Sequence, residues 1–222
     1  MPFSRAVGPA PAETDELTAN MVGIGMNFAA SASPQPNIED TLFYTSVEAI
    51  EKPDLRVLAV LTTWFGIYAK WVNADRLTQI VANEKSQRVR AFWSALAHFC
   101  RKDPRFARLG RLYSGTRQDL LSSGTDFQIM RHGEDQRFAG SPLRVPGNVL
   151  RNRLKDVLPA TELARRHHAF RYRVIIGPGY RADMWAAIEA DPTLSVAELA
   201  RKTYGSFATA WRVKRDFAIL RP

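Results

Sequence analysis

The stretch "YRADMWAAIEADPTLSVAELARKTYGSFATAWRVKRDFAIL", residues 180–220, gives the clearest structural prediction in the chain. Its first part carries apolar residues at helical spacing and stops at Asp191-Pro192, so we expect a helix that ends there. Ser195 and Glu198 then have the spacing of a capping box, which predicts the start of a second helix, "VAELARK".

A third helix is expected after a turn at Tyr204-Gly205, with Ser206 as its N-cap. Its buried face is predicted at Ala210, Val213 and Phe217, which turns two hydroxyls and two cations outward: Ser206, Thr209, Arg212 and Lys214. Hydroxyls and helix N-terminal amides hold phosphate, and arginine can bridge O6 and N7 of guanine. The predicted DNA-binding set also includes the neighbouring cations Arg201, Lys202 and Arg215.

The segment "ELARKTYGSFATA" resembles the pattern "ELAxxxGxSxxTV" of helix-turn-helix and winged helix-turn-helix bacterial regulators. Ser206 and Thr209 keep their distances of six and nine residues from Ala200. The glycine departs from the pattern, because Gly205 follows Ala200 by five residues and leaves Tyr204 where the turn usually has glycine. The resemblance implies a DNA-binding transcriptional regulator; a trihelical packing module that does not bind DNA is the alternative.

Size, basic charge and helix-turn-helix units also give the chain a resemblance to the AbiEi-type antitoxin regulators. Members of that family repress their own operon and neutralise a nucleotidyltransferase toxin, so this resemblance implies an antitoxin and a toxin partner. No motif in the chain is specific to that family. Its members commonly carry the winged helix at the N-terminus, whereas the motif of this chain lies at the C-terminus.

The charge of the chain is +9, and it is distributed unevenly. Residues 1–55 carry a net charge of −6, residues 56–143 carry +7 and residues 144–222 carry +8. A basic body of this kind attracts polyanions, and nucleic acid is the commonest polyanion in a cytoplasm. Charge alone is equally consistent with solubility.

Composition predicts a soluble, cytoplasmic protein without a membrane segment. The longest apolar-rich run, "VLAVLTTWFGIYAKWV", is interrupted by Lys70 before it reaches the roughly 20 residues of a membrane span. The N-terminus shows no continuous apolar region of a secretory signal. The single cysteine, Cys100, fits a reducing compartment and is expected to fill the core.

Four regions are expected along the chain. They are an extended acidic leader (1–37), a helical domain (38–117), a β-hairpin region (118–158) and a helix-turn-helix domain (159–222). The helical domain contains a long helix after Pro53, a short helix capped by Asn73 and an amphipathic helix over "SQRVRAFWSALAHFCRK". A second helix-turn-helix in this domain is left open.

Short apolar runs broken by Gly, Ser and Asp predict the hairpin, with "FQIM" and "RFA" as its strands. Arg131 and Arg137 would then flank the hairpin tip, where they could contact phosphate as a wing does. The tip sequence "RHGE" matches the motif of histidine phosphatases, but His132 lacks the later strand-borne histidine and arginine that phosphoryl transfer needs.

We therefore predict a mainly α, non-enzymatic protein with a small β-hairpin region and a C-terminal (winged) helix-turn-helix. Four histidines and one cysteine show no zinc-ligand spacing, so neither a metal nor another cofactor is expected. The predicted function is DNA binding as a transcriptional regulator, with the antitoxin role as its narrower form. The alternative is an interaction subunit that docks on a protein partner through the leader and the helical domain. The DNA sequence, the partner and the oligomeric state are not predicted.

Overall fold

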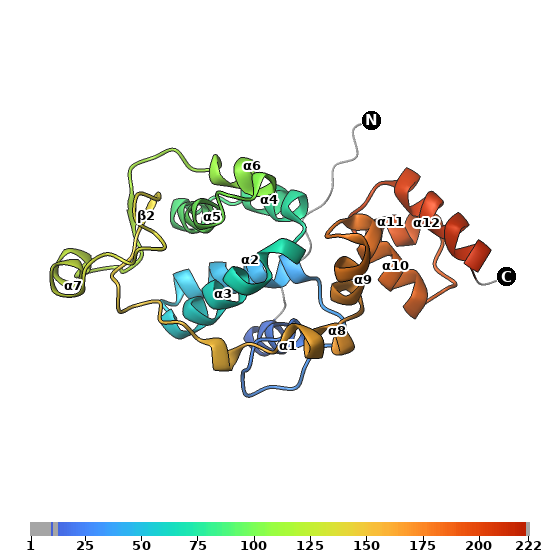
Figure 1. Ribbon diagram of the computed structural model, residues 1–222, viewed down its shortest axis with the longest axis horizontal. Helices are drawn as coiled ribbons and strands as arrows, with labels where there is room; N and C mark the ends of the chain where they lie inside the picture. The colour runs from blue at the N-terminus through green and yellow to red at the C-terminus, as the bar shows by residue number, and fades with distance from the viewer. Residues whose placement is uncertain (1–9, 11–12, 221–222) are drawn as a thin grey trace.

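The computed structural model describes residue 10 and residues 13–220 of the chain (Figure 1). This part is mainly helical, with α-helices joined by loops, short 3-10 helices and one two-stranded sheet. No described helix has both the length and the apolar character needed to cross a bilayer. The mainly α prediction is confirmed.

Four capped helices form the helical body of the protein. They are α2 (Ile38–Glu51), α3 (Leu55–Tyr68), α4 (Ala74–Ala82) and α5 (Gln87–Phe99). Their caps are Asn37, Asp54, Asn73 and Ser86, whose side-chain oxygens each accept a hydrogen bond from the first turn of the helix. Such a cap contributes about 1 kcal/mol. The Asn73 cap is as predicted, and Pro53 lies directly before Asp54, the cap of α3.

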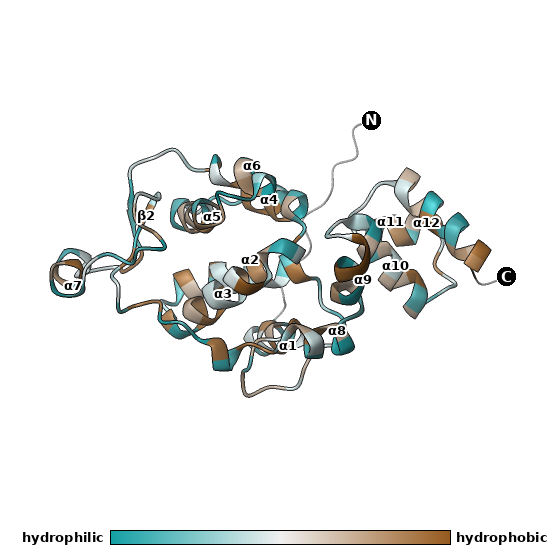
Figure 2. Cartoon of the chain, in the orientation of Figure 1, coloured by the Kyte–Doolittle hydropathy of each residue, from teal (hydrophilic) through white to brown (hydrophobic). Residues whose placement is uncertain are grey.

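Aromatic side chains of α3 and α5 fill the centre of the helical body. Trp64, Phe65 and Trp93 are fully buried, and Phe65 meets Trp93 edge to face with ring centroids 5.6 Å apart. The indole N–H groups of Trp64 and Trp93 donate to Ile24 O and Ser46 Oγ, both at 2.8 Å. Burial therefore leaves neither indole nitrogen unpaired. Figure 2 shows apolar and polar residues alternating along the helices, as expected where each helix buries one face.

Shorter elements complete the body. They are η1 (Ala69–Trp71), η2 (Pro104–Phe106) and α6 (Ala107–Gly110). Phe106 of η2 is buried against Phe65, with ring centroids 5.5 Å apart. The Asp103 side chain caps η2 through the N–H of Arg105 at 3.1 Å. Helix α6 lies on the side of the body opposite α1 (Figure 1).

The extended leader predicted for residues 1–37 is wrong for its described part. Residues Thr14–Gly23 form α1, in which Leu17 and Met21 are buried, and Ile24 and Met26 beyond it are fully buried. The apolar spacing changes from helical at Leu17 and Met21 to alternating at Ile24 and Met26, so no single periodicity signals this burial. Residues 1–9, 11 and 12 of the leader prediction lie outside the described residues.

The loop after α1 is held by the segment that leads into α8 (Ala160–Arg166) and α9 (His168–Ile176). Met26 pairs with Val157 in an isolated antiparallel bridge. The Gln35 side chain donates to Arg166 O at 2.8 Å and accepts from the N–H of His168 at 2.7 Å. Residues 24–37 are therefore part of the fold, because the chain more than a hundred residues later supplies their hydrogen-bond partners.

The β-hairpin prediction for residues 118–158 is also wrong. The two strands, β1 (Gln118–Asp119) and β2 (Leu143–Arg144), are parallel, and "FQIM" lies in helix α7 (Thr125–His132). Gly124 and Gly133 bound this helix at φ of +74° and +73°, where glycine is favoured. Phe127 and Met130 are exposed, so this apolar run has no sheet to pack on. A 3-10 turn, η3 (Leu154–Asp156), closes the region.

Helices α10 (Tyr180–Ala190), α11 (Val196–Lys202) and α12 (Phe207–Leu220) form the C-terminal three-helix unit. They share a second hydrophobic cluster, which consists of Met184, Ile188, Leu199, Ala200, Ala210 and Val213. The three helices expected within residues 180–220 are therefore present. The described residues contain no strand beside them that could act as a wing.

The first prediction concerns α1. Leu17→Ala removes a buried side chain, and the free energy of unfolding should fall by about 2 to 5 kcal/mol. Urea unfolding measures the change. The same substitution at Leu154, whose side chain is 61% exposed, is the control and should change stability by less than about 0.5 kcal/mol. Equal stability of the two variants would contradict the burial of Leu17 and support the extended leader that the sequence predicts.

The second prediction concerns His167, which is 1% exposed. Its Nδ1 accepts from the N–H of Phe170 at 3.2 Å, so Nε2 carries the proton that is donated to Pro36 O at 2.9 Å. Burial lowers the pKa of His167 from 6.5 to about 4. Because the unfolded chain takes up this proton first, stability is present above pH 6.5 and is lost as the pH falls towards 4.

The contribution of His167 should amount to roughly 2 kcal/mol between pH 7 and pH 5. His167→Gln should remove this part of the pH dependence while it retains an amide that can donate to Pro36 O. Unfolding curves at both pH values measure it, with His132→Gln as the exposed control. An unchanged slope in the His167 variant would contradict the assignment.

Candidate nucleic-acid interface

Helix α11 begins at the predicted capping box. The N–H of Glu198 donates to Ser195 Oγ at 3.2 Å, and the N–H of Ser195 donates to Glu198 Oε2 at 2.8 Å. Two N-terminal backbone groups are thereby satisfied. Leu199 and Ala200 are buried against the other two helices, so the polar side of α11 faces outward.

The turn between α11 and α12 has Tyr204, rather than glycine, in the left-handed conformation, with φ of +56°. The N–H of Gly205 donates to Ala200 O at 3.0 Å and the N–H of Tyr204 donates to Arg201 O at 3.3 Å, which is a Schellman motif. A Cβ at Gly205 would lie 2.2 Å from Cε of Met184, so any larger residue there would displace the end of that buried side chain.

The hydroxyls of Ser206 and Thr209 form the cap of α12. Ser206 Oγ accepts from the N–H of Thr209 at 3.1 Å, and the two hydroxyl oxygens are 2.8 Å apart. Ser206 is therefore the N-cap of α12, as the sequence predicts. Both side chains are half-buried, so the prediction that they form a free outward pair of hydroxyls is only partly right.

The exposed side of α12 carries cations and two aromatic rings. Arg212 is exposed and has no hydrogen-bond or ion-pair partner among the described residues. Arg215 pairs with Asp216 at 3.0 Å and lies 5.3 Å from the ring of Trp211. Phe207 and Trp211 are 47% and 50% exposed. The sequence indicates them by a spacing of four residues outside the buried stripe, a signal that our predicted set omits.

The remaining predicted cations divide between the two ends of the molecule. Arg201 and Lys202 are exposed in the last turn of α11, whereas the Lys214 ammonium donates to the carbonyl of Leu194. Arg131 lies in α7, at the end opposite α11 and α12 (Figure 1). Arg137 follows α7, and its guanidinium is held by Asp135 and the carbonyl of Leu150. The structure therefore brings neither of these two arginines to the α12 surface.

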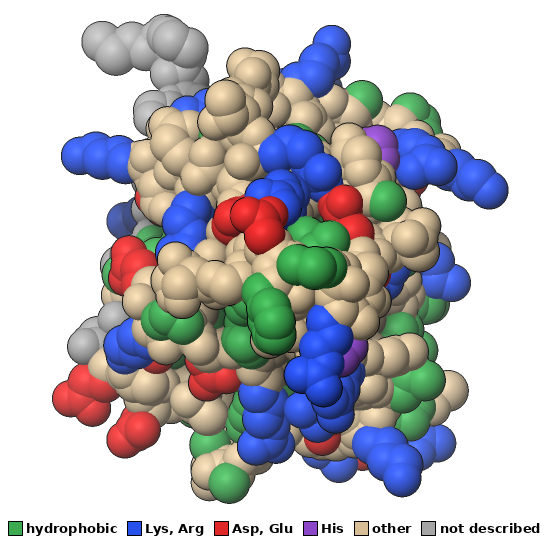
Figure 3. Space-filling view, turned by 90° about the vertical axis from the view of Figure 1, so that its left-hand side faces the viewer, with side chains coloured by type: hydrophobic (Ala, Val, Ile, Leu, Met, Phe, Trp, Pro, Cys, Tyr) green, Lys and Arg blue, Asp and Glu red, His purple; other side chains and the backbone are tan. Residues whose placement is uncertain are grey.

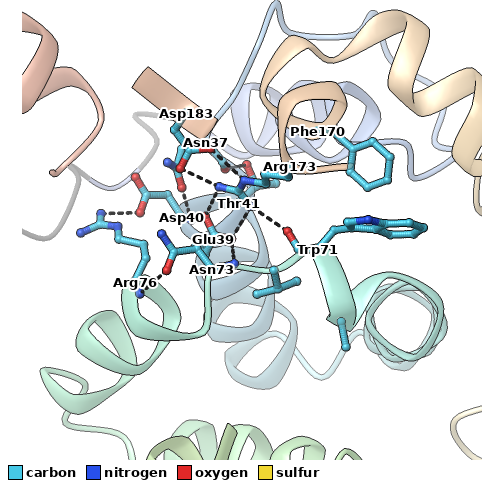
Figure 4. Close-up of polar contacts among 12 residues, drawn as sticks. Asn37, Glu39, Asp40, Thr41, Trp71, Asn73, Arg76, Phe170, Arg173 and Asp183 are labelled. Carbon is cyan, nitrogen blue, oxygen red and sulfur yellow. Dashed lines mark hydrogen bonds and ion pairs between the residues drawn. The ribbon is translucent and has the colours of Figure 1, made fainter. Parts of the chain in front are cut away.

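A buried arginine joins the C-terminal unit to the helical body (Figure 4). Arg173 of α9 binds Glu39 of α2 at 2.6 and 2.8 Å and Asp183 of α10 at 2.8 and 2.9 Å. Burial works against its charge, but Asp183 and Glu39 together hold the pKa of Arg173 above its ordinary value. Three helices therefore meet at one buried charge.

Tyr204 makes a second contact between the same two parts. Its ring lies 3.5 Å from the Arg76 guanidinium of α4, and its hydroxyl hydrogen-bonds to Asp40 of α2. Arg76 in turn binds Asp40 at 2.6 Å (Figure 4). Burial and the Asp40 carboxylate raise the pKa of Tyr204, so it stays a neutral donor. We call the Arg173 and Tyr204 contacts together the junction.

The side chains of Cys100 and His132 lie in separate parts of the structure, at the ends of α5 and α7. Burial, with Asp103 nearby, raises the pKa of the Cys100 thiol to about 11, which keeps it protonated. His132 ends the exposed helix α7. Among the described residues, no group of three or more His, Cys, Asp and Glu side chains could hold a metal ion.

Comparison with protein families, with curated proteins and with solved structures finds no match for this chain. The assignment of the site therefore depends on its geometry and on the residue pattern of α11 and α12.

The third prediction tests why tyrosine occupies the left-handed position. Tyr204→Gly relieves the backbone but removes the ring from Arg76 and the hydroxyl from Asp40, so stability should fall by about 1 to 3 kcal/mol. Tyr204→Phe keeps the ring and should cost about 1.5 to 3 kcal/mol, because the lost hydrogen bond is to a carboxylate. Urea unfolding measures both variants.

The control is a double-mutant cycle with Asp40→Asn. In that background Tyr204→Phe should cost less, because the hydroxyl no longer meets a carboxylate. A Tyr204→Gly variant more stable than the parent would show that the left-handed strain outweighs the junction.

Proposed function

We propose that the chain is a DNA-binding transcriptional regulator whose α11, turn and α12 form a helix-turn-helix. The observation that carries this is the free guanidinium of Arg212 on an exposed helix capped at Ser206. An α-helix fits the major groove, where arginine reads guanine through O6 and N7. Arg201 and Lys202 at the adjacent end of α11 supply charge for the phosphate backbone.

The N-terminal turn of α12 supports contact with an anion. Ser206 and Thr209 use their hydroxyls within the cap, so backbone N–H groups and the helix dipole remain as its phosphate-binding features. Phe207 and Trp211 add apolar surface next to Arg212 and Arg215. In a major groove such surface meets thymine methyl groups.

The narrower proposal is an antitoxin that represses its own operon, and it rests on the resemblance in size and charge alone. The second candidate function is an interaction subunit that binds a protein partner. The exposed pair Phe207 and Trp211 favours it, because aromatic side chains and arginine are enriched at protein interfaces. Docking through a free N-terminal leader is not supported, because Leu17 and Met21 are buried in its described part.

The fourth prediction tests DNA binding at α12. Arg212→Ala should weaken binding to the protein's own promoter region by about 1 to 3 kcal/mol if the side chain contacts a base. Arg201→Ala should instead weaken binding to all sequences similarly and reduce the salt dependence. A mobility-shift assay at two salt concentrations measures both effects.

Arg165→Ala is the matched control, because Arg165 is 80% exposed on α8, outside the three-helix unit. It should bind DNA as the parent does. Parent-like affinity of Arg212→Ala and Arg201→Ala would contradict the proposed interface. Absence of DNA binding by the parent protein would instead favour the interaction subunit.

A further inference from the structure

A groove of about 380 Å³ lies at the other end of the molecule, where the start of α3, helix α7 and the loop before η3 meet. Arg56, Arg151 and Arg153 line it, together with the amides of Gln128 and Asn148. Figure 3 views the molecule from the α7 end, where Lys and Arg side chains outnumber the acidic ones. None of these five residues belongs to the α12 surface.

The arginines of this groove differ from the neighbouring arginines in their pairing. Arg117 binds Glu134, Arg137 binds Asp135, and Arg144 binds Asp119 at 3.1 Å. Each of these guanidinium groups is neutralised by an adjacent carboxylate, so its role in the fold is accounted for.

The groove arginines keep N–H groups available. Among the described residues Arg56 has no hydrogen-bond acceptor, and it lies 5.8 Å from the Phe28 ring. Arg151 makes one long bond, from Nε to Asn148 O at 3.4 Å. Arg153 reaches Asp156 only at 3.9 Å, and its Nε is buried without an acceptor in the described part of the chain.

Three cations gathered in one groove repel one another unless an anion joins them. A phosphoryl group meets this need, because its oxygens accept several arginine N–H bonds at once. The amide of Asn148 lines the same groove, and its Nδ2 makes a long bond of 3.5 Å to Gln128 Oε1. A hydroxyl group carried by the same ligand would accept a further hydrogen bond from this Nδ2.

We propose that this groove binds a small phosphorylated compound, with the phosphate on Arg56, Arg151 and Arg153 and a sugar hydroxyl that accepts from the side-chain amide of Asn148. Leu55, Leu121 and Val149 also line the groove and give the rest of the ligand an apolar surface. The proposal is independent of DNA binding at α12, because the two sites share no residue and lie at opposite ends of the molecule (Figure 1).

Isothermal titration calorimetry on the full chain with inorganic phosphate, ribose 5-phosphate and adenosine monophosphate tests it. Arg56→Gln and Arg151→Gln replace exposed side chains, so both variants should fold as the parent does. Each should weaken binding of the phosphorylated probes about tenfold or more, because it removes charge-assisted hydrogen bonds. Arg165→Gln, with the same charge change on α8 outside both sites, should leave binding unchanged.

The ranking of the three probes identifies what carries the phosphate. Tighter binding of ribose 5-phosphate than of inorganic phosphate, reduced by Asn148→Ala, is the expected result. The proposal is overturned if no probe binds, or if the groove variants bind as the Arg165→Gln variant does. Binding of a single-stranded oligonucleotide through Arg56 and Arg151, without binding of the small probes, would also overturn it and assign the groove to nucleic acid.

Discussion

The buried charge of Arg173 determines how the two parts of the molecule are joined. An arginine cannot lose its proton in a protein, so its burial requires carboxylates that are buried with it. Glu39 comes from α2 and Asp183 from α10, and the carbonyl of Trp71 accepts a further bond at 3.3 Å. Removing one member of such a group leaves an uncompensated charge, at a cost of about 3 to 5 kcal/mol. The placement of the C-terminal unit thus depends on charge compensation as well as on the apolar contact of Phe170 with Tyr68 and Trp71.

Tyr204 shows how the same constraint reaches the candidate interface. A non-glycine residue in the left-handed region costs roughly 1 to 2 kcal/mol. A buried cation–π contact of about 2 kcal/mol and a hydrogen bond to a carboxylate of about 1.5 to 3 kcal/mol together exceed that cost. Tyr204 therefore occupies the position that is usually glycine. Its contacts with Arg76 and Asp40 hold α11 and α12 against the helical body. The exposed face of α12 is presented in one orientation relative to the body.

The sequence predicts local features of this protein well and distant ones poorly. Asn73, Ser195 and Ser206 act as helix caps because a cap needs only the three or four residues that follow it. Arg173 and Glu39 are 134 residues apart, and no periodicity marks either of them as buried. The same limit explains α1 and α7, whose environments depend on segments far along the chain. At the candidate interface the spacing of Ser206 and Thr209 predicts the cap. Only the three-dimensional structure shows that both hydroxyls form hydrogen bonds within the cap.

Helix α3 connects the two ends of the molecule and limits how they can influence each other. It begins beside Arg56 in the groove, and η1 continues from it to Trp71, whose carbonyl accepts from Arg173. Its 14 residues span about 21 Å, and most of them are buried. A close-packed helix of this kind cannot shift without repacking its neighbours. Communication between the groove and α12 would therefore require a second arrangement of the junction. The groups that would have to change partners include the Arg173 and Arg76 ion pairs, which hold α9 and the turn at Tyr204 to α2 through charge.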